Sequence, residues 1–178
     1  MSVGRLRIAA ASGLVIGALF GLAGTFAPSA ELRGLAWGID GVALVVASAL
    51  LAVDHLRQGN DLLAAGFLVF LAGETLIVSG SAMELAASAP TFAAGAGLWA
   101  AALVLISAPA VLPLFVRATG AIAAVLLAVT SACMLARAAL TPLSTPLPFY
   151  AYPFLAMTLF GWAWAHLRVR VVPPRSPR

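Results

Sequence analysis

The stretch from residue 62 to residue 86 carries an acidic side chain where lipid is expected. It reads LLAAGFLVFLAGETLIVSGSAMELA, which is long and apolar enough to cross a bilayer, and Glu74 lies near its middle. Ionisable side chains inside transmembrane segments are rare and mark a functional site by default. Glu74 is therefore the first candidate for chemistry, namely the binding of a proton, a cation or a small polar solute.

A second acid is expected at the same depth as Glu74. When the chain is folded into a hairpin about Gln58, Asp40 lies 18 residues before the turn and Glu74 lies 16 residues after it. At the rise of an α-helix their depths differ by only about 3 Å. Two carboxylates at one depth repel each other, so at most one should carry charge. Arg137 is expected at a similar depth as a partner for Asp40. The alternative is a buried hydrogen-bonded network that fixes helix register.

Small and polar residues share a helix face with each acid. On the Asp40 face they are Gly41, Ala47, Ser48, Asp54 and His55, and on the Glu74 face they are Gly66, Gly73, Gly80, Ser81 and Glu84. Such faces point into a bundle rather than at lipid. We therefore include Ser48 and Ser81 in the intramembrane polar site and expect the three glycines of the Glu74 face to pack helices together.

The two histidines lie at one end of two different expected helices. His55 and His166 fall at the same depth, and two histidines from different helices can ligate a haem or a metal ion. The favoured interpretation is that each is a solvated side chain at the membrane interface, and we expect no cofactor. Cys133 is the single cysteine, which excludes an intrachain disulfide and a CxxC metal or redox site.

The first apolar run carries a row of glycines. Gly13, Gly17, Gly21 and Gly24 fall on one face, and this spacing lets two helix backbones approach closely in lipid. Packing inside the bundle is the favoured interpretation. The alternative is an interface with a second copy of the chain or with a partner in a larger membrane complex. We expect this run to be a retained helix rather than a cleaved signal peptide.

Composition places the whole chain in a membrane. It has 178 residues, of which 63% are hydrophobic and 9% are charged, whereas soluble domains carry about 25% charged residues. We expect one domain, an all-α polytopic bundle of six transmembrane helices. The spans run over about 6–27, 34–54, 62–86, 91–115, 118–140 and 149–167, and a basic, proline-rich tail covers 169–178. Pro109 is expected to kink the fourth span.

The distribution of arginine predicts the orientation. All ten basic residues are arginine, scattered over short loops and tails, so lipid headgroups are their expected partners and nucleic acid is not. Eight lie on one side of the six predicted spans, and only Arg33 and Arg137 lie on the other. The side richer in arginine is normally cytoplasmic, so both termini are expected in the cytoplasm. The usage of arginine, alanine and glycine is typical of a high-GC bacterial genome and so suggests a bacterial cytoplasmic membrane.

The sequence favours a transporter- or channel-like protein over an enzyme. It contains no HExxH, GxSxG, P-loop or GxGxxG motif. The favoured function uses the intramembrane carboxylates to handle a proton, a cation or a small polar solute. One alternative is a non-catalytic structural or assembly subunit of a larger membrane complex. The other is a protein that binds haem or quinone through the two histidines.

Overall fold

All regular secondary structure in the described residues is helical. The computed structural model describes residues 3–136 and 139–168. Its helices are α1 (Val3–Thr25), α2 (Ala30–Arg57), α3 (Asp61–Gly80), α4 (Ala89–Ser107), α5 (Leu114–Leu135) and α6 (Ala151–Arg168). The first five are long and apolar enough to cross a membrane. Helix α6 is not among them, because its 18 residues include several polar and aromatic side chains.

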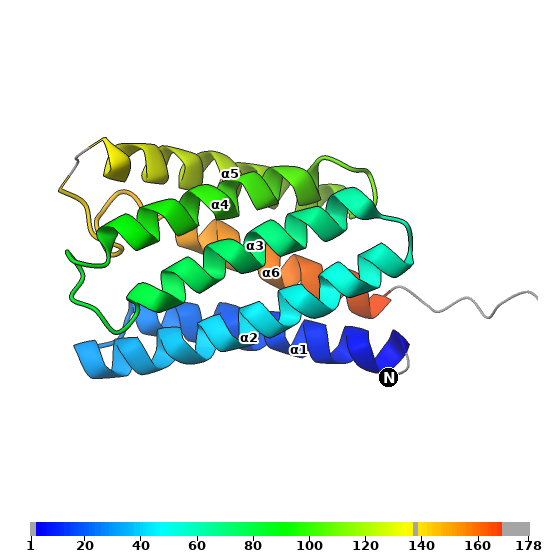
Figure 1. Cartoon of the computed structure of the whole chain (residues 1–178), viewed down its shortest axis with the longest axis horizontal. Helices are drawn as coiled ribbons and strands as arrows, with labels where there is room; N and C mark the ends of the chain where they lie inside the picture. Colours follow the sequence, from blue (N-terminus) through cyan, green and yellow to red (C-terminus); the bar gives the residue numbers. More distant parts are fainter. Residues whose placement is uncertain (1–2, 137–138, 169–178) are drawn as a thin grey trace, which may run out of the picture.

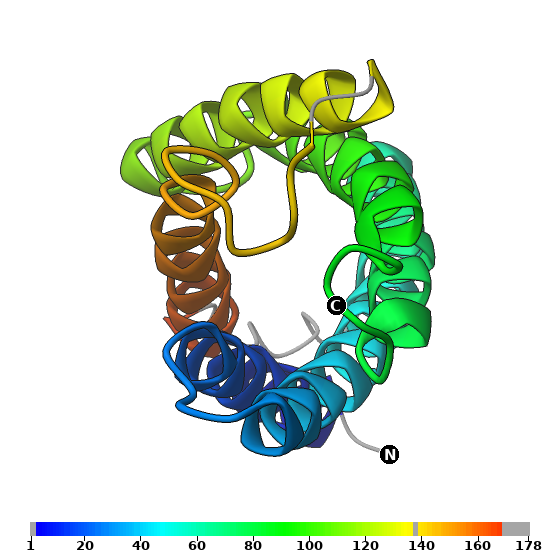
Figure 2. The same ribbon diagram turned by 90° about the vertical axis from the view of Figure 1, so that its left-hand side faces the viewer.

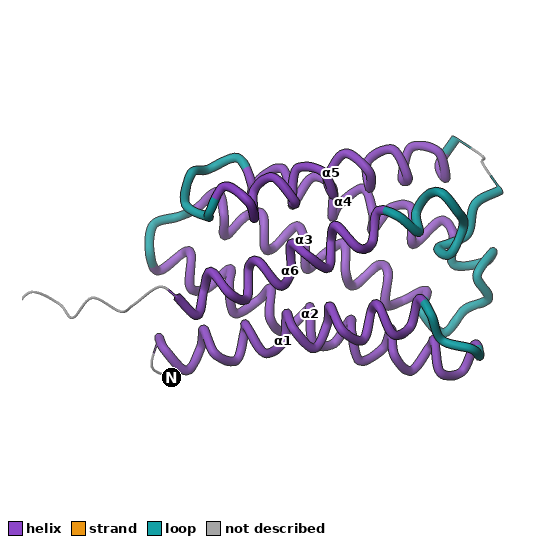
Figure 3. Tube along the Cα trace, turned by 180° about the vertical axis from the view of Figure 1, so that it is seen from behind, coloured by secondary structure: helices purple, strands orange, loops and turns teal. Residues whose placement is uncertain are grey.

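The six helices form a closed ring (Figures 1 and 2). Each helix packs against its neighbours in sequence and α6 packs against α1, and among the described residues no other pair of helices comes into backbone contact. Successive helices run in opposite directions (Figure 3). One end of the ring, which we call the loop end, carries the connections 26–29, 81–88 and 139–150. The other, which we call the terminal end, carries Val3, the connections 58–60 and 108–113, and Arg168.

Local chemistry explains where several helices begin and end. The Ser29 hydroxyl accepts the backbone N–H of Leu32 at 3.2 Å and so caps the start of α2. Gly59 has a φ of 73°, a left-handed conformation that glycine adopts without steric cost, and it turns the chain from α2 into α3. Asn60 takes the capping position of α3, and Asp61 is the first helical residue.

Three helices end well before the residue that the sequence predicted, and one of them, α5, ends at Leu135 rather than at residue 140. Helix α3 ends at Gly80 rather than at residue 86, because the chain turns at Ser81, within the turn-forming run Ser79-Gly80-Ser81. Helix α4 ends at Ser107, before Pro109, so the proline terminates the helix instead of kinking it. Arg117 then falls in the first turn of α5 rather than in a connection. Its side chain donates hydrogen bonds to the carbonyls of Ser107 and Ala108, which satisfies the exposed end of α4.

Aromatic side chains fill the middle of the ring. Phe67 and Phe70 of α3, Trp99 of α4 and Trp162 of α6 are each at most 1% exposed. Their ring centroids lie 5.1 Å apart for Phe67 and Trp162, and 5.5 Å apart for Phe70 with each tryptophan. We call these four side chains the aromatic plug. They join α6 to α3, which is not its neighbour in the ring.

Candidate functional site

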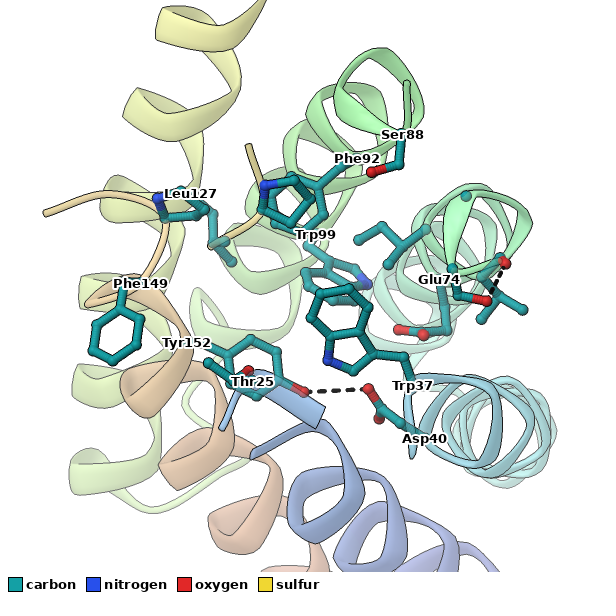
Figure 4. Close-up of a pocket in the computed structure, with 16 residues that line it drawn as sticks. Thr25, Trp37, Asp40, Glu74, Ser88, Phe92, Trp99, Leu127, Phe149 and Tyr152 are labelled. Atoms are coloured by element: carbon teal, nitrogen blue, oxygen red, sulfur yellow. Dashed lines mark hydrogen bonds between the residues drawn. The ribbon is translucent and has the colours of Figure 1, made fainter. Parts of the chain in front are cut away.

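Three elements bring polar side chains together in the half of the ring nearer the loop end. Asp40 comes from α2, Glu74 from α3 and Tyr152 from the first turn of α6, and we call them the carboxyl cluster. Asp40 is 5% exposed and Glu74 is 1% exposed. The Tyr152 hydroxyl donates a hydrogen bond to Asp40 Oδ2 at 3.2 Å (Figure 4). Because α3 stops at Gly80, Glu74 lies in its last two turns rather than at mid-span as expected.

Glycines on neighbouring helices make room for the carboxyl cluster. A β-carbon at Gly17 of α1 would lie 3.2 Å from Asp40 Oδ1, and one at Gly21 would lie 2.8 Å from Asp40 Oδ2 and would collide with the Tyr152 hydroxyl. A β-carbon at Gly41 of α2 would lie 3.2 Å from Glu74 Oε1. The small residues on these faces therefore let the acids fit inside the ring as well as letting backbones approach.

A small cavity lies beside the two acids. Its volume is about 40 Å³, and Trp37, Trp99 and Tyr152 are among the side chains that line it (Figure 4). In this view the Trp99 indole nitrogen points towards Glu74, although it makes no hydrogen bond. Loop-end residues such as Ser88 and Phe149 line the cavity too, so it lies towards that end of the ring. A single water needs roughly 10–15 Å³ of such volume, so the space fits about three waters or one small cation.

The carboxyl cluster has no compensating positive charge in the part of the chain that the structure describes. Among the described residues, the ion pair found joins Arg7 to Asp54 at the terminal end of the ring. Neither Asp40 nor Glu74 takes part in an ion pair there. Asp40 Oδ1 and Glu74 Oε2 are buried without a hydrogen-bond partner. Arg137, the expected partner of Asp40, lies outside the described residues. Two buried acids without a cation cannot both be ionised at a tolerable cost.

The other residues predicted for this site lie around it. Ser48 is fully buried in α2 and its Oγ has no hydrogen-bond partner. Ser81 lines the cavity, but its hydroxyl donates to the carbonyl of Val78 at the end of α3. The glycines of α3, which are Gly66, Gly73 and Gly80, all lie against α4 or the Ser88 just before it.

The glycine row of α1 faces the inside of the same chain. Gly13 lies against Ala43 and Ala47, Gly17 against Leu44, and Gly24 against Trp37, all in α2. Gly21 lies against the Tyr152 ring of α6 and the Asp40 carboxyl. Helices α2 and α6 cover this face, so the glycines pack inside the bundle, as favoured from the sequence, and do not form the alternative interface with a second copy or a partner.

The two histidines meet at the terminal end. His55 Nε2 and His166 Nε2 are 3.0 Å apart, and the residues are 3% and 5% exposed. The expectation of solvated interfacial histidines is therefore wrong: α2 and α6 turn both rings inward, and the His55 ring stacks on Phe67 at 5.5 Å. His166 Nδ1 lies 2.7 Å from the carbonyl of Trp162, which can only accept a hydrogen bond, so this nitrogen carries a proton.

A buried ion pair accompanies the histidines. Arg7 Nε of α1 donates to Asp54 Oδ2 at 2.9 Å, and Gln58 Nε2 donates to the same oxygen at 2.8 Å. With His55 and His166 these residues form what we call the histidine cluster, and they line a cavity of about 260 Å³. The sequence analysis grouped Arg7 with the arginines expected at lipid headgroups and did not single out Tyr152, so it missed both as partners of buried acids.

The sequence offered His55 and His166 as possible ligands of a haem or a metal ion. Over residues 3–136 and 139–168, no group of three or more histidine, cysteine, aspartate or glutamate side chains is placed to hold a metal ion. Cys133 is exposed on α5, away from the histidine pair. The histidines therefore contact each other as a hydrogen-bonded pair.

Comparisons with known proteins add no relative to this description. No protein-family model, no curated protein and no solved structure matches the chain.

Proposed function

We propose that this protein is an integral membrane protein that binds and transfers a proton or a small cation at Asp40 and Glu74. The observation that carries the proposal is the pair of buried acids, Asp40 and Glu74, which lie beside a cavity and have unpartnered oxygens. Among the described residues, no cationic side chain forms an ion pair with either acid. A purely structural acid is normally paired or fully hydrogen-bonded. A site that loads and unloads positive charge instead keeps its oxygens available.

The size of the cavity favours a proton or a small cation over a larger solute. Its volume of about 40 Å³ has no room for a sugar or an amino acid. A proton needs only the carboxyl oxygens and water, and a monovalent cation needs several oxygen ligands, which the acids, the Tyr152 hydroxyl and water supply. The polar solute considered from the sequence is therefore the least favoured cargo.

The aromatic plug favours a gated transporter over an open channel. The cavity stops at Trp99, and Phe70, Trp162 and Phe67 continue the row of rings towards the histidines. A continuous row of buried rings leaves no open aqueous path. Transfer through the ring therefore requires a second conformation in which the plug moves.

The orientation that fits this function places the terminal end in the cytoplasm, with α6 crossing the membrane beside α1. Arg5, Arg7, Arg57, Arg117 and Arg168 lie at or near the terminal end, whereas Arg33 lies near the loop end. The setting we infer is a bacterial cytoplasmic membrane, and the cavity then faces outward. An alkaline phosphatase fused to the C-terminus should be inactive and a fluorescent protein bright, and an active phosphatase would contradict the orientation.

Transfer can be measured in liposomes that contain the purified protein. An imposed gradient of protons, Na⁺ or K⁺ should collapse faster than in empty liposomes, and Glu74→Gln should lose most of that rate. Glutamine keeps the size and hydrogen bonding of the side chain but cannot titrate. Glu84→Gln is the matched control, because Glu84 is exposed in the connection 81–88 and should keep the native rate.

Two outcomes would contradict the proposal. In the first, the native protein moves none of the three ions faster than empty liposomes do. In the second, Glu74→Gln moves the ion as fast as the native protein, which would remove Glu74 from the transfer step.

A further inference from the structure

We propose that His55 and His166 form a second proton-binding site, which works as the gate at the terminal end of the ring. This inference deepens the proposed function, since it makes the cargo a proton and assigns its second binding site. It stands on the geometry of the histidine pair, which lies on the other side of the aromatic plug from the carboxyl cluster.

The hydrogen bonds fix the protons on both rings. His166 Nδ1 donates to the carbonyl of Trp162, so in the neutral ring His166 Nε2 keeps its lone pair. The contact of 3.0 Å between the two Nε2 atoms then requires that His55 Nε2 carries the proton and donates it. His55 Nδ1 is left as a lone pair, and it is buried without a partner. The pair is thus a hydrogen-bonded relay with one open acceptor.

The pair can take up two further protons, and the second of them breaks the contact that holds the rings together. The first binds at His55 Nδ1, the open acceptor, and still leaves one N–H and one lone pair between the two Nε2 atoms. When a second proton charges the other ring as well, two N–H groups face each other at a distance that suits one N–H and one lone pair. Two N–H donors at this distance repel, and the added positive charge cannot return to bulk water while both rings stay buried. Separation of the rings relieves the repulsion.

The surrounding charges do not hold a charged pair closed. Arg7 of α1 and Asp54 of α2 form an ion pair with each other, and Gln58 also donates to that carboxylate. Arg168 of α6 adds a further positive charge close by, over the Trp164 ring at 4.2 Å. Phe67 of α3 and the segment 111–113, which complete the surroundings, carry no charge. The single carboxylate is already paired, so a second proton on the histidines adds uncompensated charge.

The histidine contact is placed to control access. Helices α2 and α6 are not neighbours in the ring, because α1 lies between them (Figure 2). Two hydrogen bonds join them across the interior, Tyr152 to Asp40 towards the loop end and His55 to His166 at the terminal end. The cavity of about 260 Å³ lies beside the histidine contact. Parting of the histidines lets this cavity widen towards the plug and opens a path for the proton to the cytoplasm.

Nitrogen NMR tests the relay directly. The chain has two histidines, so protein labelled with ¹⁵N-histidine and freed of any affinity tag reports on this pair alone. At about pH 8 we expect one ring protonated at Nε2 and the other at Nδ1, with a scalar coupling between the two Nε2 atoms. Below about pH 4, where both buried rings become charged, the coupling should disappear. Identical tautomers, or no coupling at about pH 8, would overturn the relay.

Spin labels test the gate. Leu56→Cys and Leu167→Cys, both at exposed positions, place labels at the terminal ends of α2 and α6 in a Cys133→Ser background. Acidification from about pH 8 to below about pH 4, where both rings become charged, should lengthen the distance between the labels by at least the roughly 1–2 Å of a typical helix shift. The matched variant is His55→Gln with His166→Gln, which keeps an amide hydrogen bond but cannot titrate, and in it the distance should stay constant.

Failure of the proposed gate and failure of the proposed function give different results. An unchanged distance in the native protein, or an equal change in the double glutamine variant, would overturn the gate. The same measurement in Glu74→Gln should still give the native response, because the histidines titrate without that carboxyl. If the liposome experiment fails while the histidine response is intact, the proposed function is wrong and the second proton-binding site stands.

Discussion

The ring holds two polar clusters at its two ends, and they differ in how their charges are balanced. In the histidine cluster, Arg7 pairs with Asp54, Gln58 donates to the same carboxylate, and the imidazoles satisfy one another at Nε2. In the carboxyl cluster, Asp40 and Glu74 share a cavity and the Tyr152 hydroxyl is the hydrogen-bond donor found for Asp40. Similar burial thus serves two purposes. Paired charges fix helices in place, whereas unpaired acids leave oxygens for a ligand at some expense in stability.

The largest effect is expected where the charges are paired. Asp54→Leu leaves the Arg7 guanidinium buried beside an apolar side chain, and loss of one partner of a buried pair costs about 3–5 kcal/mol. Thermal unfolding in detergent should therefore show a large drop in the melting temperature. Glu84→Leu, at an exposed position, is the control and should melt like the native protein. A native melting temperature for Asp54→Leu would mean that this cluster does not stabilise the ring.

A smaller effect is expected from crowding the carboxyl cluster. Gly17→Leu pushes a side chain against Leu44 and Asp40, and overpacking of this kind costs about 1–3 kcal/mol. The melting temperature and the rate of ion transfer should both fall. Gly38→Leu is the matched control, because a β-carbon at Gly38 would meet no atom within 4 Å. Equal melting temperatures for the two leucine variants would show that the α1–α2 contact is looser than described.

The smallest change should have the opposite sign. Glu74→Leu removes a buried acid that has an unpartnered oxygen, and such an oxygen costs roughly 1–3 kcal/mol, part of which the shape change of the new side chain cancels. We expect a melting temperature equal to or slightly above that of the native protein, together with loss of ion transfer. A clear loss of stability would instead place Glu74 among the structural residues and erase the difference between the clusters.

Hydropathy and spacing predict the membrane class, the helical content and the common depth of Asp40 and Glu74. These properties depend on local composition and on the pitch of the helix, which the sequence contains directly. The end of α3 at Gly80 does not show in hydropathy, because Ala82 and Met83 continue the apolar run, although Ser79, Gly80 and Ser81 are residues that favour a turn. A hydropathy profile detects solubility in lipid and cannot detect a turn within an apolar segment.

The partners of the acids depend on ring closure, which helix periodicity does not report. Tyr152 reaches Asp40 because α6 returns to pack on α1. A signal was nevertheless present in the spacing. Asp40 and His55 are 15 residues apart in α2, and Tyr152 and His166 are 14 apart in α6. Both intervals are close to four helical turns, so each pair lies on one face, and the two faces can meet at both ends.

Closure of the ring also means that the junction between the last helix and the first resembles every other junction. Helices α6 and α1 pack side by side in opposite directions, and Arg168 and Val3 lie at the same end of the molecule as the connection 58–60 (Figure 1). Packing of this kind does not depend on where the polypeptide starts. A circular permutant that joins Arg168 to Val3 through a short flexible linker and opens the chain at Gly59 should therefore keep the order of helices around the ring. Both new termini would emerge on the original side of the membrane.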